Sequence, residues 1–329
     1  MHDIQTLLKE NPIVVAPMAG ITDKAFRLIA REFGAGLLYS EMVSAKAITY
    51  KNKKTYDLFD LTGEVNPIAI QLFGSEPDVL AEAAIFVQET AKPFSIDINM
   101  GCPVPKVIKN NEGSALMKDP ALAASLVSAV KKAVHLPVSV KFRSGWDDEN
   151  QNYLDFAKRI EDAGADFIAF HPRTKTQMYT GRSNWSQIGE VKKAITIPVI
   201  ASGDVYTASD FNALRDQTDC DGVMLARGVL GNFYLIKEIQ ASLANDSYEE
   251  PTAVNKLTLL KKHLQLLISH KGEAIAVKEI RKFFAWYTKN LPRAAKIRTQ
   301  VNSIKTEAEF LTFLNTLIED DYFGDAPNN

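Results

Sequence analysis

Up to about residue 228, short apolar runs alternate with amphipathic stretches along the chain. The runs are rich in β-branched residues and nearly continuous in apolar side chains, which is typical of parallel strands buried on both faces. The stretches between them repeat their apolar residues at helical spacing. Eight runs occur, at residues 13–18, 37–43, 67–73, 95–99, 137–143, 167–171, 197–201 and 222–226. The clearest helical stretches are residues 23–33, 78–90, 120–134, 153–163 and 185–195.

Eight strand-then-helix units in succession predict an α/β fold, a closed (β/α)8 TIM barrel. In such a barrel the ligand-binding side chains lie at the C-terminal ends of the strands, because the strand bodies only pack. Local signals support the helices. Thr22 and Ser75 stand where N-caps are expected, and Gly34 and Gly164 stand where helices should end.

After Gly231 the strand pattern disappears. Residues 232–244 predict the last barrel helix, residues 245–251 a polar linker, and residues from 252 to about 318 a group of helices. We therefore predict a barrel domain over residues 1–245, a smaller all-helical C-terminal domain over residues 252–320 and an acidic tail over residues 321–329. A chain of 329 residues suits this division, since such a barrel needs roughly 250.

The composition is that of an ordinary globular protein, with 46% hydrophobic and 24% charged residues. The first twelve residues mix acidic and basic side chains and lack the apolar core of a secretory signal. No apolar run approaches the roughly 20 residues of a membrane span. Two cysteines and five scattered histidines provide neither a disulfide framework nor a metal-ligand cluster. We expect a cytoplasmic monomer with no membrane segment and no metal site.

The net charge of −2 hides an uneven distribution. Residues 256–305 contain twelve Lys or Arg and two Glu, a net of +10, so the remainder of the chain carries about −12. A basic module of this kind is typical of a surface that neutralises nucleic-acid phosphates. The alternative is a solvated helix face over an aromatic core.

Most of the predicted strands end in a residue able to bind a ligand. In chain order these residues are Pro17, Met18 and Ala19, Gln71, Asn99 with Cys102, Lys141 with Arg143, His171 with Arg173, Gly203 with Asp204, and Arg227 with Gly228. Glycines follow the seventh and eighth runs, at the place where barrels often bind a phosphate through backbone N–H groups. Tight turns are the alternative reason for those glycines.

No dinucleotide fingerprint competes with this phosphate site. The Gly34-Ala35-Gly36 stretch lacks a third glycine and follows a helix instead of a strand. A mononucleotide such as FMN is therefore favoured over a tightly bound NAD or FAD.

Lys141 could hold a fixed positive charge against an anionic ligand such as a reduced flavin, although a surface lysine is the alternative. Gln71 and Asn99 can each donate and accept, as pairing to a pyrimidine edge requires, or they could satisfy loop backbone. Cys102 lies on a turn constrained by Gly and Pro, where its thiol could act as nucleophile or as general acid. Cys220 has the pattern of a core residue.

Together these residues resemble the tRNA-dihydrouridine synthase family, and the similarity runs from about Val15 to Arg298. The run Asn-x-Gly-Cys-Pro, with Lys141 and His171 at this spacing downstream, is highly specific. The matching segments are 16–23 (APMAGITD), 71–74 (QLFG), 97–103 (DINMGCP), 140–143 (VKFR), 171–174 (HPRT), 202–204 (SGD) and 224–228 (MLARG).

The resemblance implies a flavin enzyme that reduces the C5=C6 bond of uridines in tRNA. Hydride would pass from NADPH to FMN and then to C6, while Cys102 protonates C5. FMN would be held by Pro17, Met18, Ala19, Gln71, Lys141 and His171, with its phosphate on Ser202, Gly203, Asp204, Ala226, Arg227 and Gly228. The uracil would be held by Asn99, Arg143 and Arg173, and the tRNA backbone by Arg281, Lys282, Arg293 and Arg298.

Two other functions remain open at this level. A flavin barrel acting on a free pyrimidine, such as a dihydroorotate or dihydropyrimidine dehydrogenase, leaves the basic module without a role. A non-catalytic RNA-binding regulator explains that module but not Cys102 with a full set of flavin contacts. Neither NADPH nor NADH has a recognisable motif in the chain.

Overall fold

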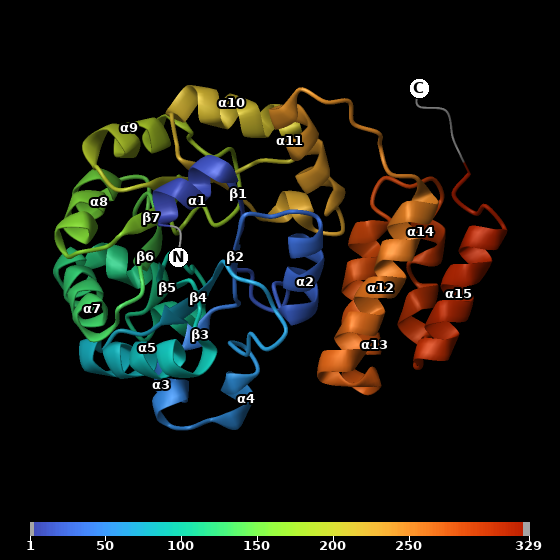
Figure 1. Ribbon diagram of the computed structural model, residues 1–329, viewed down its shortest axis with the longest axis horizontal. Coiled ribbons are helices and arrows are strands. Elements are labelled where there is room, and N and C mark those ends of the chain that lie inside the picture. The colour runs from blue at the N-terminus through green and yellow to red at the C-terminus, as the bar shows by residue number, and fades with distance from the viewer. Residues whose placement is uncertain (1–2, 325–329) are drawn as a thin grey trace. The chain divides into compact units, whose positions relative to one another are not determined.

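The computed structural model describes residues 3–324, and its first part is a parallel barrel surrounded by helices (Figure 1). All strand pairings in the barrel are parallel. The strands are β1 (Ile13–Val15), β2 (Leu37–Tyr39), β3 (Val43–Ser44), β4 (Ile68–Phe73), β5 (Ser95–Met100), β6 (Val138–Arg143), β7 (Phe167–His171), β8 (Val199–Ser202) and β9 (Gly222–Leu225).

The sheet closes on itself through β1 and β2. Val14 pairs with Leu37 of β2 on one side and with Met224 of β9 on the other, and β2 also pairs with β4. Within residues 3–324, eight strands therefore form a closed ring, and the short β3 is an additional partner of β4. This confirms the predicted TIM barrel.

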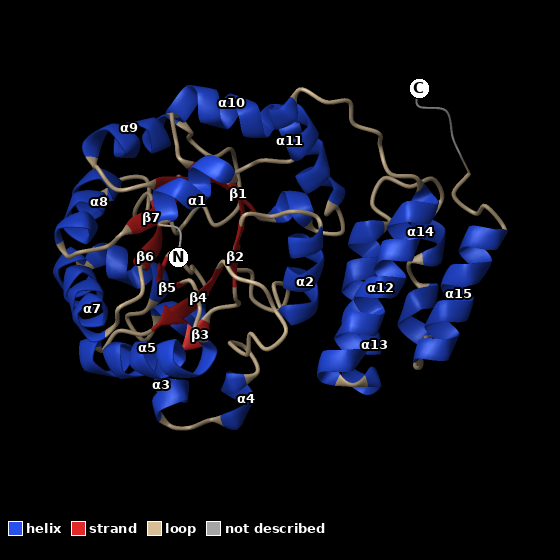
Figure 2. Cartoon of the chain, in the orientation of Figure 1, coloured by secondary structure: helices blue, strands red, loops and turns tan. Residues whose placement is uncertain are grey.

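Helices cover the outside of the barrel (Figure 2). The helices between successive barrel strands are α2 (Lys24–Glu32), α5 (Pro77–Ala91), α7 (Pro120–Ala133), α8 (Tyr153–Asp162), α9 (Ser186–Ala194) and α10 (Ala208–Thr218). Shorter helices are α1 (Ile4–Glu10), α3 (Ala45–Thr49), α4 (Lys53–Tyr56), α6 (Pro105–Ile108) and η1 (Gly113–Lys118). Small and branched side chains such as Val14, Ala69 and Ile200 fill the barrel core.

Several local predictions need correction. The run 37–43 is two strands, because the chain leaves the ladder at Ser40, whose Oγ accepts a hydrogen bond from the backbone N–H of Gln71 and donates to the carbonyl of Glu41. The N-cap of α2 is Asp23 and not Thr22, and the N-cap position of α5 is residue 76 and not 75. The helix-ending glycines 34 and 164 have positive φ values directly after α2 and α8, as predicted.

The chain divides into two compact units, Met1–Ala226 and Arg227–Asn329. Within the described residues, the second unit is all-helical. It contains η2 (Arg227–Val229), α11 (Tyr234–Ala244), α12 (Ala253–Lys271), α13 (Glu273–Tyr287), α14 (Ala294–Ile297), η3 (Gln300–Ser303) and α15 (Glu307–Glu319). Residues 325–329 of the expected acidic tail lie outside the described residues.

α11 groups with the helical unit, whereas the sequence pattern assigns it to the barrel. The ring of Phe233, at its N-terminus, lies against the rings of His263 and Tyr287. Just before it, Gly231 has a φ of 64°, and a Cβ there would lie 2.4 Å from the backbone N of Tyr287. Only a glycine allows the two segments to approach this closely.

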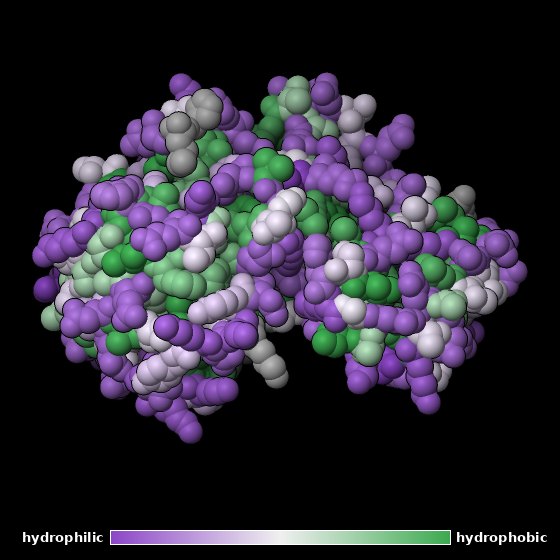
Figure 3. Space-filling view, turned by 60° about the horizontal axis from the view of Figure 1, so that its bottom comes forward, coloured by the Kyte–Doolittle hydropathy of each residue, from purple (hydrophilic) through white to green (hydrophobic). Residues whose placement is uncertain are grey.

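Polar side chains cover much of the face shown in Figure 3, with apolar patches between them. In the part of the chain that the structure describes, no helix has the length and apolar character needed to cross a membrane.

Candidate active site

The strand ends bring the predicted site residues into adjacent positions on the ladder. Gln71 of β4 pairs with Asp97 of β5, and Asn99 pairs with Lys141 of β6. Arg143 lies two residues after Lys141 on β6, on the same face of the strand, and pairs with His171 of β7. Because alternate residues of a strand face the same side, the side chains of Gln71, Asn99, Lys141, Arg143 and His171 converge at one mouth of the barrel.

A chain of hydrogen bonds leads from the catalytic candidate to a buried carboxylate. The backbone N–H of Cys102 donates to Oδ1 of Asn99 at 2.9 Å, and Nδ2 of Asn99 donates to Oε1 of Gln71 at 2.8 Å. Nε2 of Gln71 donates to Oδ2 of Asp97 at 2.6 Å, and Oγ of Ser139 donates to Oδ1 of Asp97 at 2.6 Å. Gln71 and Asn99 are both buried, so their amides are held in one orientation.

Asp97 is fully buried at the base of this chain. Burial raises the pKa of Asp97 to about 6, against the opposing hydrogen bonds from Ser139 and Gln71 and the charge of Lys141. Asp97 is not among the ligand-binding residues predicted from the sequence. Its spacing of two residues from Asn99 places both on the same face of β5, and that spacing is the signal that was missed.

The turn that carries Cys102 is fixed by its neighbours. The carbonyl of Cys102 accepts hydrogen bonds from the backbone N–H and the hydroxyl of Ser114, at 3.0 and 2.9 Å. Gly113 has a φ of 60°, and a Cβ there would lie 2.8 Å from the carbonyl oxygen of Cys102. Burial raises the pKa of the Cys102 thiol, against the charges of Arg143 and Lys141. The group is therefore a thiol and not a thiolate near neutral pH.

Lys141 is partly exposed at the mouth, and its place on the inner ladder argues against a surface lysine. Burial lowers the pKa of Lys141 to about 8, helped by the charge of Arg143 and opposed by Asp97 and Cys102. A lysine with this pKa is still mainly protonated at pH 7. It can therefore serve as the expected positive charge.

Arg143 braces two loops. Its Nε donates to the carbonyl of Gly101 at 2.8 Å, and its Nη1 donates to the carbonyls of Thr174 and Met178 at 3.0 and 2.8 Å. The guanidinium also lies 5.5 Å from the ring of Tyr179. These bonds join the turn before Cys102 to the loop after β7. They do not test the expected role of Arg143 in holding a uracil, which remains a prediction.

Arg173 is 1% exposed and is bound mainly to the loop that follows it. Its Nε donates to the carbonyl of Thr180 at 3.1 Å and its Nη2 to the carbonyl of Gly181 at 2.8 Å. Nη2 also forms an ion pair with Oδ2 of Asp204 at 2.6 Å. Arg173 thereby links the loop after β7 to the loop after β8, and its contact with a uracil also remains a prediction.

The loop after β8 contains the expected phosphate segment. Nδ1 of His171 donates to the carbonyl of Ser202 at 2.7 Å, and Nε1 of Trp185 donates to the carbonyl of Gly203 at 3.0 Å. Burial, with the nearby charge of Lys141, lowers the pKa of His171 well below its usual value. A neutral imidazole that donates from Nδ1 leaves Nε2 as an acceptor. This Nε2 is buried and has no partner.

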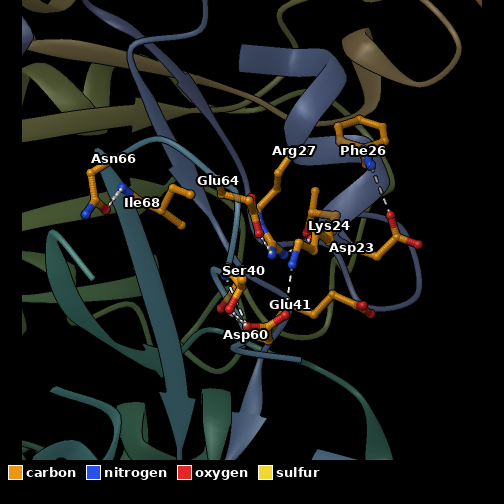
Figure 4. A network of polar contacts seen from close by, with 12 residues as sticks. Asp23, Lys24, Phe26, Arg27, Ser40, Glu41, Asp60, Glu64, Asn66 and Ile68 are labelled. Atoms are coloured by element: carbon orange, nitrogen blue, oxygen red, sulfur yellow. Dashed lines mark hydrogen bonds and ion pairs between the residues drawn. The ribbon is translucent and has the colours of Figure 1, made fainter. Parts of the chain in front are cut away.

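The loop after β1 carries Pro17, Met18 and Ala19, and Figure 4 shows the polar contacts beside it. Oγ1 of Thr22 accepts from the backbone N–H of Met18 at 2.9 Å, and Nη1 of Arg27 donates to the carbonyl of Thr22 at 2.9 Å. Arg27 is held in turn by Glu64 through a buried ion pair, with Nε 2.9 Å from Oε2. The loop is therefore fixed before any ligand binds.

The loop after β9 begins with Ala226, which packs against the barrel core, as does Met18. Arg227 and Gly228 follow directly in η2 and belong to the second unit, so their place in a phosphate site remains a prediction. Among residues 3–324, no group of three His, Cys, Asp or Glu side chains could hold a metal ion.

The basic residues of the helical unit differ in their surroundings. Nη2 of Arg281 donates to the carbonyl of Ile304 at 2.7 Å, and Lys282 lies 5.0 Å from the ring of Phe283. Arg293 is exposed but lies 5.0 Å from the ring of Tyr322. The basic residues that are exposed in and around the loop after α13 are Lys289, Arg293, Lys296 and Arg298.

Comparison with known proteins identifies the family of this chain. The model of the dihydrouridine synthase (Dus) family matches residues 14–321, which include the barrel, its mouth and the helical unit. The chain belongs to the dihydrouridine synthase family. The matched range includes Gln71, Asp97, Asn99 and Cys102, the residues of the hydrogen-bond chain described above.

Curated members of the dihydrouridine synthase family match almost the whole chain. A protein of Synechocystis named probable tRNA-dihydrouridine synthase 1 is 41% identical, over 96% of this chain and 88% of that protein. The tRNA-dihydrouridine synthase B of Pseudomonas aeruginosa is 36% identical, over 91% of this chain and 90% of that protein. Among solved structures, a variant of NCR from Zymomonas mobilis has a TM-score of 0.49 and 17% identity, over 75% of this chain and 91% of that one.

Proposed function

We propose that this dihydrouridine synthase family member reduces the C5=C6 bond of uridines in tRNA, with FMN as cofactor and NAD(P)H as reductant. The names of its relatives and the family match support the substrate class. The observation that carries the chemistry is the partly buried thiol of Cys102, on a turn whose backbone N–H is bound by Asn99 at the barrel mouth. We place this reaction in the cytoplasm and assign it to a monomer.

The side chains at the mouth suit a flavin mononucleotide. Nε2 of His171 is a buried acceptor without a partner, so it suits a ligand hydroxyl or ring N–H. Lys141 offers a positive charge to the anionic form of a flavin. Bound FMN would supply hydride transfer at this position. The proposed contacts are Pro17, Met18, Ala19, Gln71, Lys141 and His171, with the phosphate on residues 202–204 and 226–228.

Cys102 would act as the general acid. The C5=C6 bond of uracil is conjugated with a carbonyl, so hydride addition at C6 builds enolate charge that a proton at C5 removes. A thiol whose pKa is raised by burial holds that proton at neutral pH, whereas a nucleophile would need the thiolate. The sequence left Cys102 as either a nucleophile or a general acid, and this environment favours the general acid.

Asn99 can hold the uracil without releasing the turn of Cys102. Its Oδ1 is used by backbone N–H groups, and one N–H of its amide is used by Gln71. The other faces only Sδ of Met42, a weak acceptor at 3.9 Å. A uracil carbonyl could replace this sulfur, while Arg143 and Arg173 hold the surrounding loops in place.

A base within folded tRNA must be flipped out to reach this mouth, so the enzyme needs a surface that grips the backbone. We assign that role to the basic side chains of the helical unit, with Arg293 and Arg298 exposed and Arg281 and Lys282 partly buried. Arg281 already binds the carbonyl of Ile304, so its contribution would be partly structural.

The test is a reduction assay on tRNA transcripts, which lack dihydrouridine, with the purified yellow protein and NADPH. Dihydrouridine in the transcript, with oxidation of NADPH, is the expected result. Reduction of free uracil at a rate equal to that of tRNA would favour a free-pyrimidine enzyme instead. A protein that binds tRNA but carries no flavin would overturn the proposal.

A further inference from the structure

Three buried polar atoms without a hydrogen-bond partner lie on residues bound to the segment 202–204. They are Nε2 of His171, Nη1 of Arg173 and Oγ of Ser183. His171 binds a carbonyl of the segment, while Arg173 and the backbone N–H of Ser183 bind its carboxylate. Buried polar groups are normally hydrogen-bonded, so three open ones around one short segment indicate a ligand that binds there.

Ser183 lies in the loop between β7 and α9, directly against the backbone of Gly203. A Cβ built on Gly203, whose φ is 154°, would lie 2.1 Å from Oγ of Ser183 and 3.4 Å from Nδ1 of His171. Any other residue at position 203 would collide with this hydroxyl. The glycine of the expected phosphate segment and the hydroxyl of Ser183 thus share one small space.

The chemistry of the three atoms identifies the class of ligand. Nη1 of Arg173 is a fixed cationic donor, and the hydroxyl of Ser183 can donate as well. The nearby carboxylate of Asp204 is already paired with Nη2 of Arg173 at 2.6 Å. Two open donors suit an anionic oxygen, whereas the acceptor Nε2 of His171 needs an O–H or N–H. A phosphate monoester joined to a polyol, such as FMN, offers both.

Building on the proposed FMN function, we propose that the hydroxyl of Ser183 donates a hydrogen bond directly to the phosphate of the bound cofactor. Arg173, which is bound to Asp204 of the phosphate segment, would be the fixed positive charge beside it, in place of the uracil contact expected from the sequence. Without the ligand, the hydroxyl of Ser183 lowers the stability of the fold, because it has lost its hydrogen bonds to water and has gained none in the protein. Removing the hydroxyl should therefore weaken cofactor binding without weakening the fold. If Ser183 only packs against its neighbours, its substitution should not weaken cofactor binding while leaving the stability of the fold unchanged.

The test compares Ser183→Ala with Ser186→Ala, whose hydroxyl is exposed and bonds to Oδ1 of Asn184 at 2.8 Å. Dissociation constants are measured on the diluted holoenzyme from the fluorescence of released flavin, for FMN and for riboflavin, which lacks the phosphate. Ser183→Ala should weaken FMN binding about tenfold and leave riboflavin binding unchanged. Its flavin-free form should melt at the wild-type temperature or higher. Ser186→Ala should change neither affinity.

The other outcomes contradict the proposal in different ways. If wild-type protein binds FMN and Ser183→Ala binds it equally well, the hydroxyl is no ligand, although the proposed function stands. Equal weakening of FMN and riboflavin would assign Ser183 to the ring, the ribityl chain or the fold, and not to the phosphate. If the wild-type protein binds neither flavin, both the proposed function and this inference are wrong.

Discussion

Nδ2 of Asn99 donates to Oε1 of Gln71, so the orientations of these two amides determine each other. The carboxylate of Asp97 can only accept, and it therefore turns the NH2 group of Gln71 toward itself. Gln71 then presents its oxygen to Asn99, and Asn99 presents its oxygen to the backbone N–H of Cys102. One buried carboxylate thus fixes the direction of every hydrogen bond up to the proposed acid.

Replacing Asp97 should change how stability depends on pH. The native pKa of about 6 lies above the ordinary value of 3.8, so the folded protein binds more protons than the unfolded chain between these values. The carboxylate therefore destabilises the fold above about pH 6, by roughly 3 kcal/mol, and does not do so below about pH 4. Relative to wild type, Asp97→Asn should gain about this much stability between pH 4 and pH 7. Urea unfolding of both proteins at the two pH values measures the difference, and a constant difference would contradict it.

Cys102→Ala should retain flavin and oxidise NADPH at nearly the wild-type rate. Dihydrouridine formation should fall by roughly 10² to 10⁴, because general acid catalysis acts only in the second half-reaction. Stopped-flow measurements of the two half-reactions separate these effects. Cys220→Ala is the matched control, since Cys220 is the other free cysteine and is buried; an equal loss in that variant would indicate a general effect on the fold.

Lys141→Ala should slow flavin reduction while FMN stays bound, because the positive charge is lost and the phosphate site is retained. The same charge predicts a pH dependence. Since the pKa of Lys141 is lowered to about 8, the charge is present below that pH and is lost as the pH rises through it. In a Cys102→Ala background, where the thiol no longer titrates, NADPH-driven flavin reduction should decline above about pH 8. A flat profile would remove Lys141 from this step.

Charge reversal in the loop after α13 should weaken tRNA binding and reduce its salt dependence. The variant Lys289→Glu, Lys296→Glu and Arg298→Glu changes exposed side chains only, whereas Arg281 and Arg293 contact a carbonyl and a ring. Each lost phosphate contact should lower the slope of log affinity against log salt by about 0.7 to 0.9. The control reverses three exposed lysines on barrel helices, Lys132, Lys158 and Lys193. Equal loss in the two variants would indicate net charge alone.

Deleting residues from Thr252 onward should leave a chain that aggregates, so it is a poor test of tRNA binding. Phe233 of the second unit lies against the rings of His263 and Tyr287, both of which the deletion removes. The shortened chain should expose this aromatic ring. Aggregation is therefore expected, and light scattering of the truncated protein would detect it.

The sequence by itself determined the barrel and the contents of its mouth. Strands buried on both faces need continuous apolar runs, and eight of these in succession leave a closed parallel barrel as the architecture. The same periodicity identified the strand ends, and with them Cys102, Lys141 and His171. These signals are local, because the residue types of a strand by themselves indicate whether it is buried.

Only the tertiary structure decided which side chains bind one another. Gln71 and Asp97, Arg173 and Asp204, and Ser183 and Gly203 are each separated by many residues, and their pairing depends on strand register and loop conformation. The closure of β2 onto β4 and the grouping of α11 with the helical unit have the same origin. Local periodicity records whether a residue is buried, but not which distant residue it meets, since that contact forms only when the whole barrel closes.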